Sequence, residues 1–381
     1  MGLFGRILVS FTIGVTLLTL LASRWLVGGK RWRAAAAGIV ALNVIIGRYI
    51  MADDVWLHNE QSLMMPFLAG IIIFVAEVIL VVMVLLAVLI RWLRRRWLSM
   101  LDRPVDTSRR RLLACGAAYP VAALGLATYG GTIGRTDLVR RDFTIASPLY
   151  RGLDGYRIVQ ISDAHLGLFM SVDDLRNLLE QAAATQADML AVTGDIFDDV
   201  RQNDAAVELM AGYADRFPDG IWFCLGNHEY MRGVDHILQR LRATPVHVLV
   251  NEAAEVPGRG LYMMGGGYPF VKGPGFYERK RSYFAQALAA VPEGVPTVLL
   301  AHHPEFIDDA AAAGVPLTLT GHTHGSQFGL FGQPLLPVFK YTRGMVRIGG
   351  SYGYVHSGNG SWFPLRIGCP PELAVFTLRG C

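Results

Sequence analysis

Hydrophobic positions divide the chain near residue 134. Before this point they form long apolar stretches, and after it short apolar runs alternate with polar and glycine-rich segments. The long stretches are Ile7–Ala22, Ala34–Gly47, Leu63–Ile90 and Leu112–Gly134. The first, third and fourth approach or exceed the ~20 residues needed to span a bilayer. We therefore predict a membrane domain over residues 1–134, with four transmembrane helices, or three if the second stretch does not span, and a soluble domain over residues 135–381.

The soluble part contains five short runs of β-branched and apolar residues that predict buried strands. They are Tyr156–Ser162, Asp188–Thr193, Ile221–Leu225, Pro296–Ala301 and Pro316–Thr320. Between the first two, residues 172–187 carry apolar side chains at helical spacing, which predicts a β-α-β unit. Open α/β sheets place their functional residues at the carboxyl ends of the strands.

Residues with metal-binding side chains follow each of these runs. They are Asp163 and His165, Asp195, Asn227, His302, and finally His322 and His324. Aspartate, histidine and asparagine offer the oxygen and nitrogen donors that borderline divalent metals prefer, without any thiolate. The pattern predicts the dinuclear metal site of a hydrolase.

The chain resembles the calcineurin-like metallophosphoesterases, especially the membrane-linked branch with bacterial YkuE-type phosphoesterases. The resemblance covers roughly residues 140–381 and rests on five motifs in the family's order, namely Ser162–Gly167, Gly194–Asp198, Gly226–Glu229, His302–Pro304 and Gly321–Gly325. The tail, with Tyr354–Gly360, Arg366 and Pro370–Glu372, is similar to the closing hairpins of that branch. The resemblance to this family implies an α/β/β/α sandwich and the activity of a metal-dependent phosphoric ester hydrolase.

The resemblance also implies roles for the site residues. One metal would be held by Asp163, His165 and His324, the other by Asn227, His302 and His322, and Asp195 would bridge both. The cofactors would be two divalent ions (Mn, Zn or Fe) about 3.5–4 Å apart, which lower the pKa of water and clamp an in-line phosphoryl displacement. His228 would act on the substrate phosphate, stabilising charge or protonating the leaving oxygen. Asp198 and Glu229 would orient the ligand loops.

The remaining histidines are interpreted by their neighbours. His236, His247 and His356 are predicted to be core residues, because a lone histidine in an apolar context is usually a packed one. His303 adjoins a predicted ligand, and two interpretations stay open: its side chain lines the site or points away from it.

The segment from Gly265 to Tyr283 departs from the resembling branch. That branch commonly carries a Gly-Asp-Asp type of sequence here, whereas Gly265–Phe270 reads Gly-Gly-Gly-Tyr-Pro-Phe, so the family's usual substrate contacts do not carry over. A basic cluster follows, made of Lys272, Arg279, Lys280 and Arg281. It could grip an anionic substrate, but we favour a solvated surface.

Basic residues predict the orientation in the membrane, because short cytoplasmic loops are enriched in Lys and Arg. The segment between the third and fourth apolar stretches holds eight arginines, from Arg91 to Arg111, whereas Asp53, Asp54 and Glu60 lie between the second and third. The catalytic domain is therefore expected on the extracytoplasmic side of a bacterial inner membrane. The net charge of +4 comes largely from these arginines, which argues against nucleic acid as a specific partner.

Two local features bear on export and redox state. Ser108–Leu113 is similar to a twin-arginine export signal, although flanking positive charge alone explains it equally well. The four cysteines are too few for a disulfide framework. Cys115 and Cys224 are predicted to be packing residues, and Cys369 and Cys381 could pair.

Two classes of function compete at this point. The first is a membrane-anchored phosphoesterase that cleaves a phosphomonoester, phosphodiester or pyrophosphate bond, with a lipid-linked or cell-envelope substrate favoured by the tether. The second is a membrane transport or sensing protein with a regulatory metal-binding domain. Glu77, inside the third apolar stretch, supports the second class, because an ionisable residue at that depth is usually functional, and Asn43 could be its partner.

Overall fold

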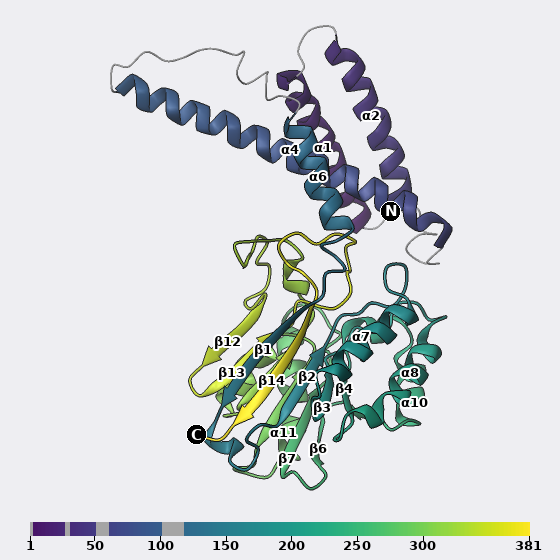
Figure 1. The fold of residues 1–381 in the computed structure, drawn as a ribbon, viewed down its shortest axis with the longest axis vertical. Coiled ribbons are helices and arrows are strands. Elements are labelled where there is room, and N and C mark those ends of the chain that lie inside the picture. Colours follow the sequence, from purple (N-terminus) through teal and green to yellow (C-terminus); the bar gives the residue numbers. More distant parts are fainter. Residues whose placement is uncertain (1–2, 27–30, 51–60, 101–117) are drawn as a thin grey trace. The chain divides into compact units, whose positions relative to one another are not determined.

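A computed structural model describes residues 3–26, 31–50, 61–100 and 118–381 (Figure 1). The chain separates into two compact units, Met1–Ile133 and Gly134–Cys381. Each unit is described separately below.

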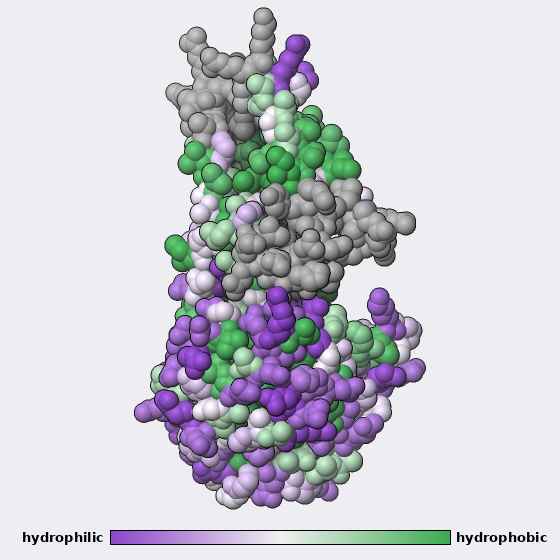
Figure 2. Space-filling view, turned by 90° about the vertical axis from the view of Figure 1, so that its right-hand side faces the viewer, coloured by the Kyte–Doolittle hydropathy of each residue, from purple (hydrophilic) through white to green (hydrophobic). Residues whose placement is uncertain are grey.

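The first unit consists of helices. These are α1 (Leu3–Leu26), α2 (Arg31–Ile50), α4 (Gln61–Met100) and α6 (Ala118–Gly131). Among the described helices, only Met64–Leu98 within α4 is both long and apolar enough to cross a membrane, while Ser10–Arg24 and Trp32–Gly47 form shorter apolar helices. The described residues therefore contain one candidate span, and the further spans that the sequence predicted stay predictions; the start of the fourth stretch, Leu112–Gly134, lies outside the described residues. The described parts of the first and last apolar stretches are helical, as α1 and α6. Figure 2 shows hydrophobic surface on the described part of the first unit.

A buried polar contact joins three of these helices. Asn43 Nδ2 on α2 donates a hydrogen bond to Glu77 Oε2 on α4 at 2.7 Å, and Thr19 Oγ1 on α1 lies 3.4 Å from the same oxygen. All three side chains are buried. The partnership expected between Asn43 and Glu77 is confirmed.

The second unit is a sandwich of two six-stranded mixed sheets. The first sheet has the order β1 (Val139–Ala146), β14 (Glu372–Arg379), β2 (Arg157–Ile161), β3 (Met189–Val192), β4 (Ile221–Cys224) and β5 (His247–Leu249). The second has the order β12 (Gly344–Ile348), β13 (Ser351–Val355), β9 (Leu317–Thr320), β8 (Thr297–Ala301), β7 (Leu261–Gly266) and β6 (Glu252–Val256). Apolar side chains from both sheets share one buried cluster, including Ile158, Trp222, Met263 and Val298.

Helices cover the outer face of each sheet, which gives the α/β/β/α arrangement that the resemblance implied. On the first sheet these are α7 (Val172–Ala184), α8 (Asn203–Gly212) and α10 (Val234–Arg242), and on the second α11 (Pro274–Ala289) and α12 (Phe306–Ala312). The helix α7 begins at a capping box, in which Ser171 and Asp174 satisfy each other's backbone N–H groups. The remaining short elements are η1 (Pro148–Tyr150), η2 (Ala214–Arg216), α9 (Asn227–Met231), η3 (His324–Ser326), β10 (Gly329–Leu330) and β11 (Gln333–Pro334).

The parallel strands position the predicted ligands. In the first sheet β2, β3 and β4 are parallel neighbours, and in the second β7, β8 and β9 are. All five strands predicted ahead of a ligand are present, as β2, β3, β4, β8 and β9. Because parallel strands end at one edge of their sheet, the loops that follow them meet there.

Candidate metal centre

The ligand loops have an unusual backbone. Five of the seven predicted ligands adopt a positive φ: Asp163 at 52°, His165 at 50°, Asp195 at 54°, His322 at 73° and His324 at 50°. This conformation is uncommon for residues other than glycine and costs on the order of 1–3 kcal/mol each. Such strain concentrates at functional sites, where the surrounding structure enforces it.

Glycines in the motifs allow these loops to approach one another. A Cβ on Gly226 would lie 2.1 Å from Asp195 Oδ1, and one on Gly321 would lie 2.3 Å from Asp163 Oδ2. Gly194, at φ 83°, would place a Cβ 2.4 Å from the backbone nitrogen of Gly226. A side chain at any of these positions would push the carboxylates or their loops apart.

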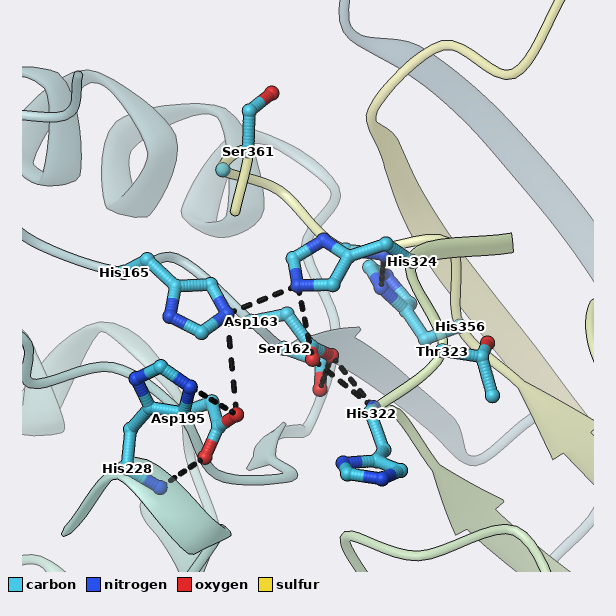
Figure 3. Close-up of polar contacts among 12 residues, drawn as sticks. Ser162, Asp163, His165, Asp195, His228, His322, Thr323, His324, His356 and Ser361 are labelled. Atoms are coloured by element: carbon cyan, nitrogen blue, oxygen red, sulfur yellow. Dashed lines mark hydrogen bonds and ion pairs between the residues drawn. The ribbon is translucent and has the colours of Figure 1, made fainter. Parts of the chain in front are cut away.

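One group of donors surrounds Asp163. His165 Nε2 and His324 Nε2 lie 2.9 Å apart, and His324 Nε2 lies 3.5 Å from Asp163 Oδ1. The two rings point toward one another in Figure 3. The ligand atoms of Asp163, His165 and His324 all lie within 4.8 Å of one another. Two nitrogens and a carboxylate oxygen converging in this way fit a divalent cation.

A second group forms around His302. Its Nδ1 lies 2.7 Å from the Thr193 carbonyl oxygen, to which it can donate, so in the neutral ring that binds a metal the lone pair is on Nε2. That Nε2 lies 3.1 Å from Asp195 Oδ2 and 3.2 Å from His322 Nδ1. The side-chain oxygen of Asn227 is buried and has no hydrogen-bond partner, which is costly unless a ligand such as a cation binds it. These donors also fit a metal ion.

The Asp195 carboxylate takes part in both groups. Its Oδ2 lies 3.1 Å from His302 Nε2 and 3.8 Å from His165 Nε2. Its Oδ1 accepts a hydrogen bond from the backbone N–H of His228 at 2.8 Å. A carboxylate shared by two sets of histidines is placed where a bridging ligand would be.

The electrostatics of this region favour bound cations. Burial opposes ionisation of Asp195, but His302, His228 and His165 hold the pKa of its carboxyl well below the usual range. Burial alone would lower the pKa of His302, yet Asp195 and Asp163 outweigh it and raise that pKa to about 10. The anionic carboxylates thus attract positive charge. Protons on the histidines supply that charge here, and metal ions would compete with these protons for the same site.

Asp198 orients two histidines at once. Its Oδ1 lies 2.5 Å from His228 Nδ1 and its Oδ2 lies 3.1 Å from His165 Nδ1, while Arg232 Nε donates to Oδ1 at 3.1 Å. Burial opposes its ionisation, but the hydrogen bonds from His165 and His228 keep the pKa of its carboxyl far below the usual range. An ionised Asp198 accepts from both Nδ1–H groups, so the Nε2 atoms face the site.

Glu229 ties the short helix α9 to the loop after β3. Its Oε2 accepts from the backbone N–H groups of Gly226 at 2.7 Å and Asp195 at 2.9 Å, and its Oε1 accepts from Ile196 at 2.8 Å and Phe197 at 3.3 Å. The side chain is fully buried. It therefore holds the loop that carries Asp195, as the resemblance implied.

Replacing Glu229 by glutamine is expected to destabilise the second unit, Gly134–Cys381, which is called the catalytic unit from here on because it carries the candidate metal centre. The new NH₂ group would face backbone N–H donors, so at least one buried donor loses its acceptor, at a cost of about 1–3 kcal/mol. Urea denaturation of Glu229→Gln, followed by circular dichroism, measures the loss. The control is Glu255→Gln, at an exposed position on β6, which should unfold like the wild type. Equal stability of the two variants would contradict the role given to Glu229.

Arg366 is a site residue whose role the sequence did not predict. Its side chain is fully buried, and its Nη2 donates to the Ser357 carbonyl at 2.8 Å and lies 3.2 Å from His324 Nδ1. Nη1 donates to the Cys369 carbonyl at 3.1 Å. The C-terminal tail therefore supports the His324 ring from behind. The sequence signal that could have revealed this role is a lone arginine among apolar residues and glycine, which indicates a buried charge with specific partners.

An aromatic wall stands beside the second group of donors. The Tyr268 ring centroid lies 5.5 Å from that of His322 and 6.0 Å from that of His303. The rings of Phe276 and Phe339 lie 4.7 and 5.8 Å from that of His303. His303 is buried and its pKa falls to about 3, because of burial first and then of His302 and Lys280. Of the two interpretations of His303, the structure supports the one that places it along the site.

Two of the three histidines predicted to be core residues are not. His236 is exposed on α10 and its Nε2 lies 2.9 Å from Asp204 Oδ1. His247 is exposed on β5, at the edge of the sheet, and stacks on Trp222 at 4.3 Å. Only His356 is buried, where its Nδ1 accepts from the backbone N–H of Gly358.

The basic cluster after Phe270 does not act as a unit. Lys280, expected on a solvated surface, is buried, and its Nζ contacts Asp309 at 2.9 Å and the Glu305 carbonyl at 2.8 Å. It therefore joins α11 to α12. Its neighbours Lys272, Arg279 and Arg281 are exposed, as expected.

The suggested pairing of Cys369 with Cys381 is wrong for this structure. Cys369 is buried with its Sγ 3.4 Å from the His324 carbonyl oxygen, whereas Cys381 is exposed, and both are free thiols. Cys224 is buried in β4, as predicted for a packing residue. Cys115 and the stretch Ser108–Leu113 lie outside the described residues.

Comparisons with known proteins agree with the fold and the ligand motifs. Residues 156–326 match the model of the calcineurin-like phosphoesterase family. A metallophosphoesterase from Aquifex aeolicus is 30% identical over 228 residues, which cover 59% of this chain and 85% of that protein. YkuE of Bacillus subtilis, also named a metallophosphoesterase, is 28% identical over 298 residues, covering 71% and 98% of the two chains.

A longer relative gives a partial match. A metallophosphoesterase from Helicobacter pylori strain J99 is 30% identical over 229 residues, which cover 58% of this chain but only 59% of that protein. The chain therefore spans about 59% of the length of that relative. With the strand order, the motif loops and the relatives in agreement, this chain belongs to the calcineurin-like metallophosphoesterase family.

Proposed function

We propose that the chain is a membrane-anchored phosphoesterase with a dinuclear metal centre. Asp163, His165 and His324 would hold one divalent ion, Asn227, His302 and His322 the other, and Asp195 would bridge them, with manganese, zinc or iron as the metals. The observation that carries this proposal is the position of Asp195 Oδ2, between His302 Nε2 at 3.1 Å and His165 Nε2 at 3.8 Å.

The side chains have complementary tasks in ester hydrolysis. Bound metals would activate a water molecule and neutralise the phosphate oxygens. His228, whose Nδ1 is held by Asp198, keeps Nε2 free to donate a proton to the leaving oxygen. That Nε2 lies 3.9 Å from Asp195 Oδ2, and the ligand atoms of His165, Asp195 and His228 lie within 4.8 Å of one another, so in this proposal His228 adjoins the metal ligands and acts on the substrate. Asp198 and Glu229 fix the loops, and Arg366 fixes the His324 ring.

The substrate would be a phosphomonoester, phosphodiester or pyrophosphate, with a lipid-linked or cell-envelope compound favoured. The support is α4, whose segment Met64–Leu98 can cross a bilayer and would keep the catalytic unit near lipid. The arginines 91, 94, 95 and 96 lie near the end of α4 and favour a cytoplasmic end there. With the apolar stretch Leu112–Gly134 crossing the membrane once more, as the sequence predicts, the catalytic unit would lie on the extracytoplasmic side of a bacterial inner membrane, and the twin-arginine export machinery is the proposed partner.

A second candidate is transport or sensing, with the metal unit as a regulator. The buried contact among Thr19, Asn43 and Glu77 is the observation that favours it. The metal-binding motifs favour hydrolysis, since a regulatory site does not need the Asp198–His228 pair.

A substrate screen tests the proposed function. The purified protein, stripped of metal, would be supplied in turn with Mn²⁺, Zn²⁺, Mg²⁺ and Fe²⁺ and offered p-nitrophenyl phosphate, bis-p-nitrophenyl phosphate, a nucleotide pyrophosphate and phospholipid vesicles. We expect hydrolysis of at least one substrate and only with metal. No hydrolysis under any condition would favour the transport or sensing candidate.

Reporter fusions test the proposed topology. A reporter that is active only after export should be active when fused after Cys381 and silent when fused after Arg103, because the arginine-rich segment is expected inside the cell. Expression of both fusions is checked by immunoblotting. The reverse pattern of activity would place the catalytic unit in the cytoplasm.

A further inference from the structure

Large apolar side chains gather at the surface in the segment between the ligand His324 and the strand β12. Phe331 is 95% exposed and Val338 is 82% exposed, and Leu330, Leu335 and Leu336 are each more than half exposed. Trp362 is also more than half exposed, and its neighbour Phe363 contacts Phe328 at the start of the segment, with ring centroids 6.2 Å apart. We name these six exposed residues, Leu330, Phe331, Leu335, Leu336, Val338 and Trp362, the apolar rim. Single exposed apolar residues are ordinary, but a concentrated set marks an interaction surface.

The most exposed member of the rim has a strained backbone. Phe331 and Gly332 form the two-residue turn between β10 and β11, in which Leu330 pairs with Gln333. Their φ angles are 50° and 79°, as in the type I′ turn, which prefers Asn-Gly. Phenylalanine is costly in this conformation and gains no burial to offset the cost. The side chain at the tip is therefore better explained by a contact outside the chain than by folding.

Charge around the rim fits an anionic partner. Residues 310–371 contain no aspartate or glutamate, but they contain Lys340, Arg343, Arg347 and the buried Arg366. Asp308, which reaches this segment from α12, is paired with Lys340 at 2.8 Å. The segment thus supplies apolar side chains and basic residues but no carboxylate of its own, and the neighbouring carboxylate of Asp308 is paired with Lys340. This is the composition of a surface that enters the interface of an anionic bilayer.

The rim is continuous with the candidate metal centre. Val338 is followed by Phe339, whose ring centroid lies 5.1 Å from that of the predicted ligand His322 and 5.8 Å from that of His303. A surface that holds the rim against lipid would therefore hold the metal ligands within reach of lipid phosphates.

We propose that the apolar rim inserts into the interface of an anionic lipid bilayer and presents the metal centre to membrane phosphoesters. This proposal rests on the proposed function for the identity of the reaction, but the contact itself is a separate property of the surface. A bilayer is favoured over a protein partner by the absence of acidic residues from the segment and by α4, which can bring the chain to a membrane.

Photo-crosslinking tests the contact directly. The full chain would carry p-benzoylphenylalanine at position 331, at position 338, or at the exposed position 255 on β6 as the control. After reconstitution into vesicles of phosphatidylcholine with phosphatidylglycerol, irradiation should give lipid adducts at 331 and 338 at least several-fold above those at 255. Fewer adducts are expected in vesicles of phosphatidylcholine alone. Adduct levels at 331 and 338 no higher than at 255, or crosslinks to a second chain instead of lipid, would overturn the proposal.

Phe331→Asn separates contact from folding. Asparagine suits the turn, so the unfolding temperature should be unchanged or higher, and a clear fall would show that Phe331 serves stability instead. Hydrolysis of soluble bis-p-nitrophenyl phosphate with metal should stay within about twofold of wild type, because Phe331 is not part of the site.

If lipid adducts form but no ester is hydrolysed, the proposed function fails and the lipid contact stands. If the soluble ester is hydrolysed but no lipid adducts form, the lipid contact fails and the proposed function stands.

Discussion

Asp195→Asn is expected to lose both metal ions and to reduce phosphoesterase activity by at least about 10³-fold. The asparagine keeps the shape of the side chain, and its oxygen can still accept from the backbone N–H of His228. It removes the negative charge that lies between His302 and His165. Loss of a bridging ligand forfeits several kcal/mol of metal stabilisation, and each 1.36 kcal/mol changes the rate tenfold.

Metal analysis and activity on one soluble ester measure this effect. The matched control is Asp204→Asn, which neutralises an exposed carboxylate paired with His236 and Arg240. The control should keep its metals and its activity. An Asp195→Asn protein that retained both metals would show that this carboxylate does not bridge them.

His228→Ala should retain both metals but lose about 10²–10⁴-fold in rate, the usual contribution of a positioned proton donor. The loss should depend on the leaving group. An alkyl phosphate needs its leaving oxygen protonated, whereas a nitrophenyl leaving group departs as an anion, so the loss should be much smaller for the nitrophenyl ester. Measuring kcat for both esters with the wild type and with His228→Ala tests whether His228 protonates the leaving oxygen.

The imidazole of His236 provides a control for this variant. His236→Ala removes an exposed ring on α10 and should change neither rate. Equal losses for both esters in His228→Ala would mean that His228 stabilises charge without donating a proton. A loss of metal from the His228→Ala protein would show that His228 is a metal ligand.

Local sequence pattern was sufficient to predict the sandwich and its ligand loops. Buried parallel strands are short, continuous apolar runs, and a metal ligand must follow directly at the strand end, so the two signals coincide at Ile161–Asp163 and at Ala301–His302. Residues whose environment depends on distant segments were predicted less well. His236 and His247 sit on the exposed face of a helix and on an edge strand, positions that only the assembled sheet defines.

The contributions of the C-terminal half were also beyond local pattern. Arg366 reaches His324 from 42 positions away in the sequence, and Tyr268 meets His322 from a loop that departs from the family pattern. Neither contact leaves a periodic signal, because each depends on how two loops fold over the sheet edge. Likewise, hydropathy identified apolar stretches in the first unit without fixing the helices, and among the described helices only α4 contains a segment that is both long and apolar enough to span a membrane.

The metal content of the purified wild-type chain tests the dinuclear centre most directly. Elemental analysis after loading with Mn²⁺ or Zn²⁺, followed by removal of loosely bound ions, should give about two metal ions per chain, because candidate ligands gather around both Asp163 and His302, and Asp195 lies near histidines of both groups. The variant Asn227→Ala, which removes the unpaired buried oxygen, should give close to one. A wild-type chain that binds a single ion under these conditions would contradict the dinuclear centre.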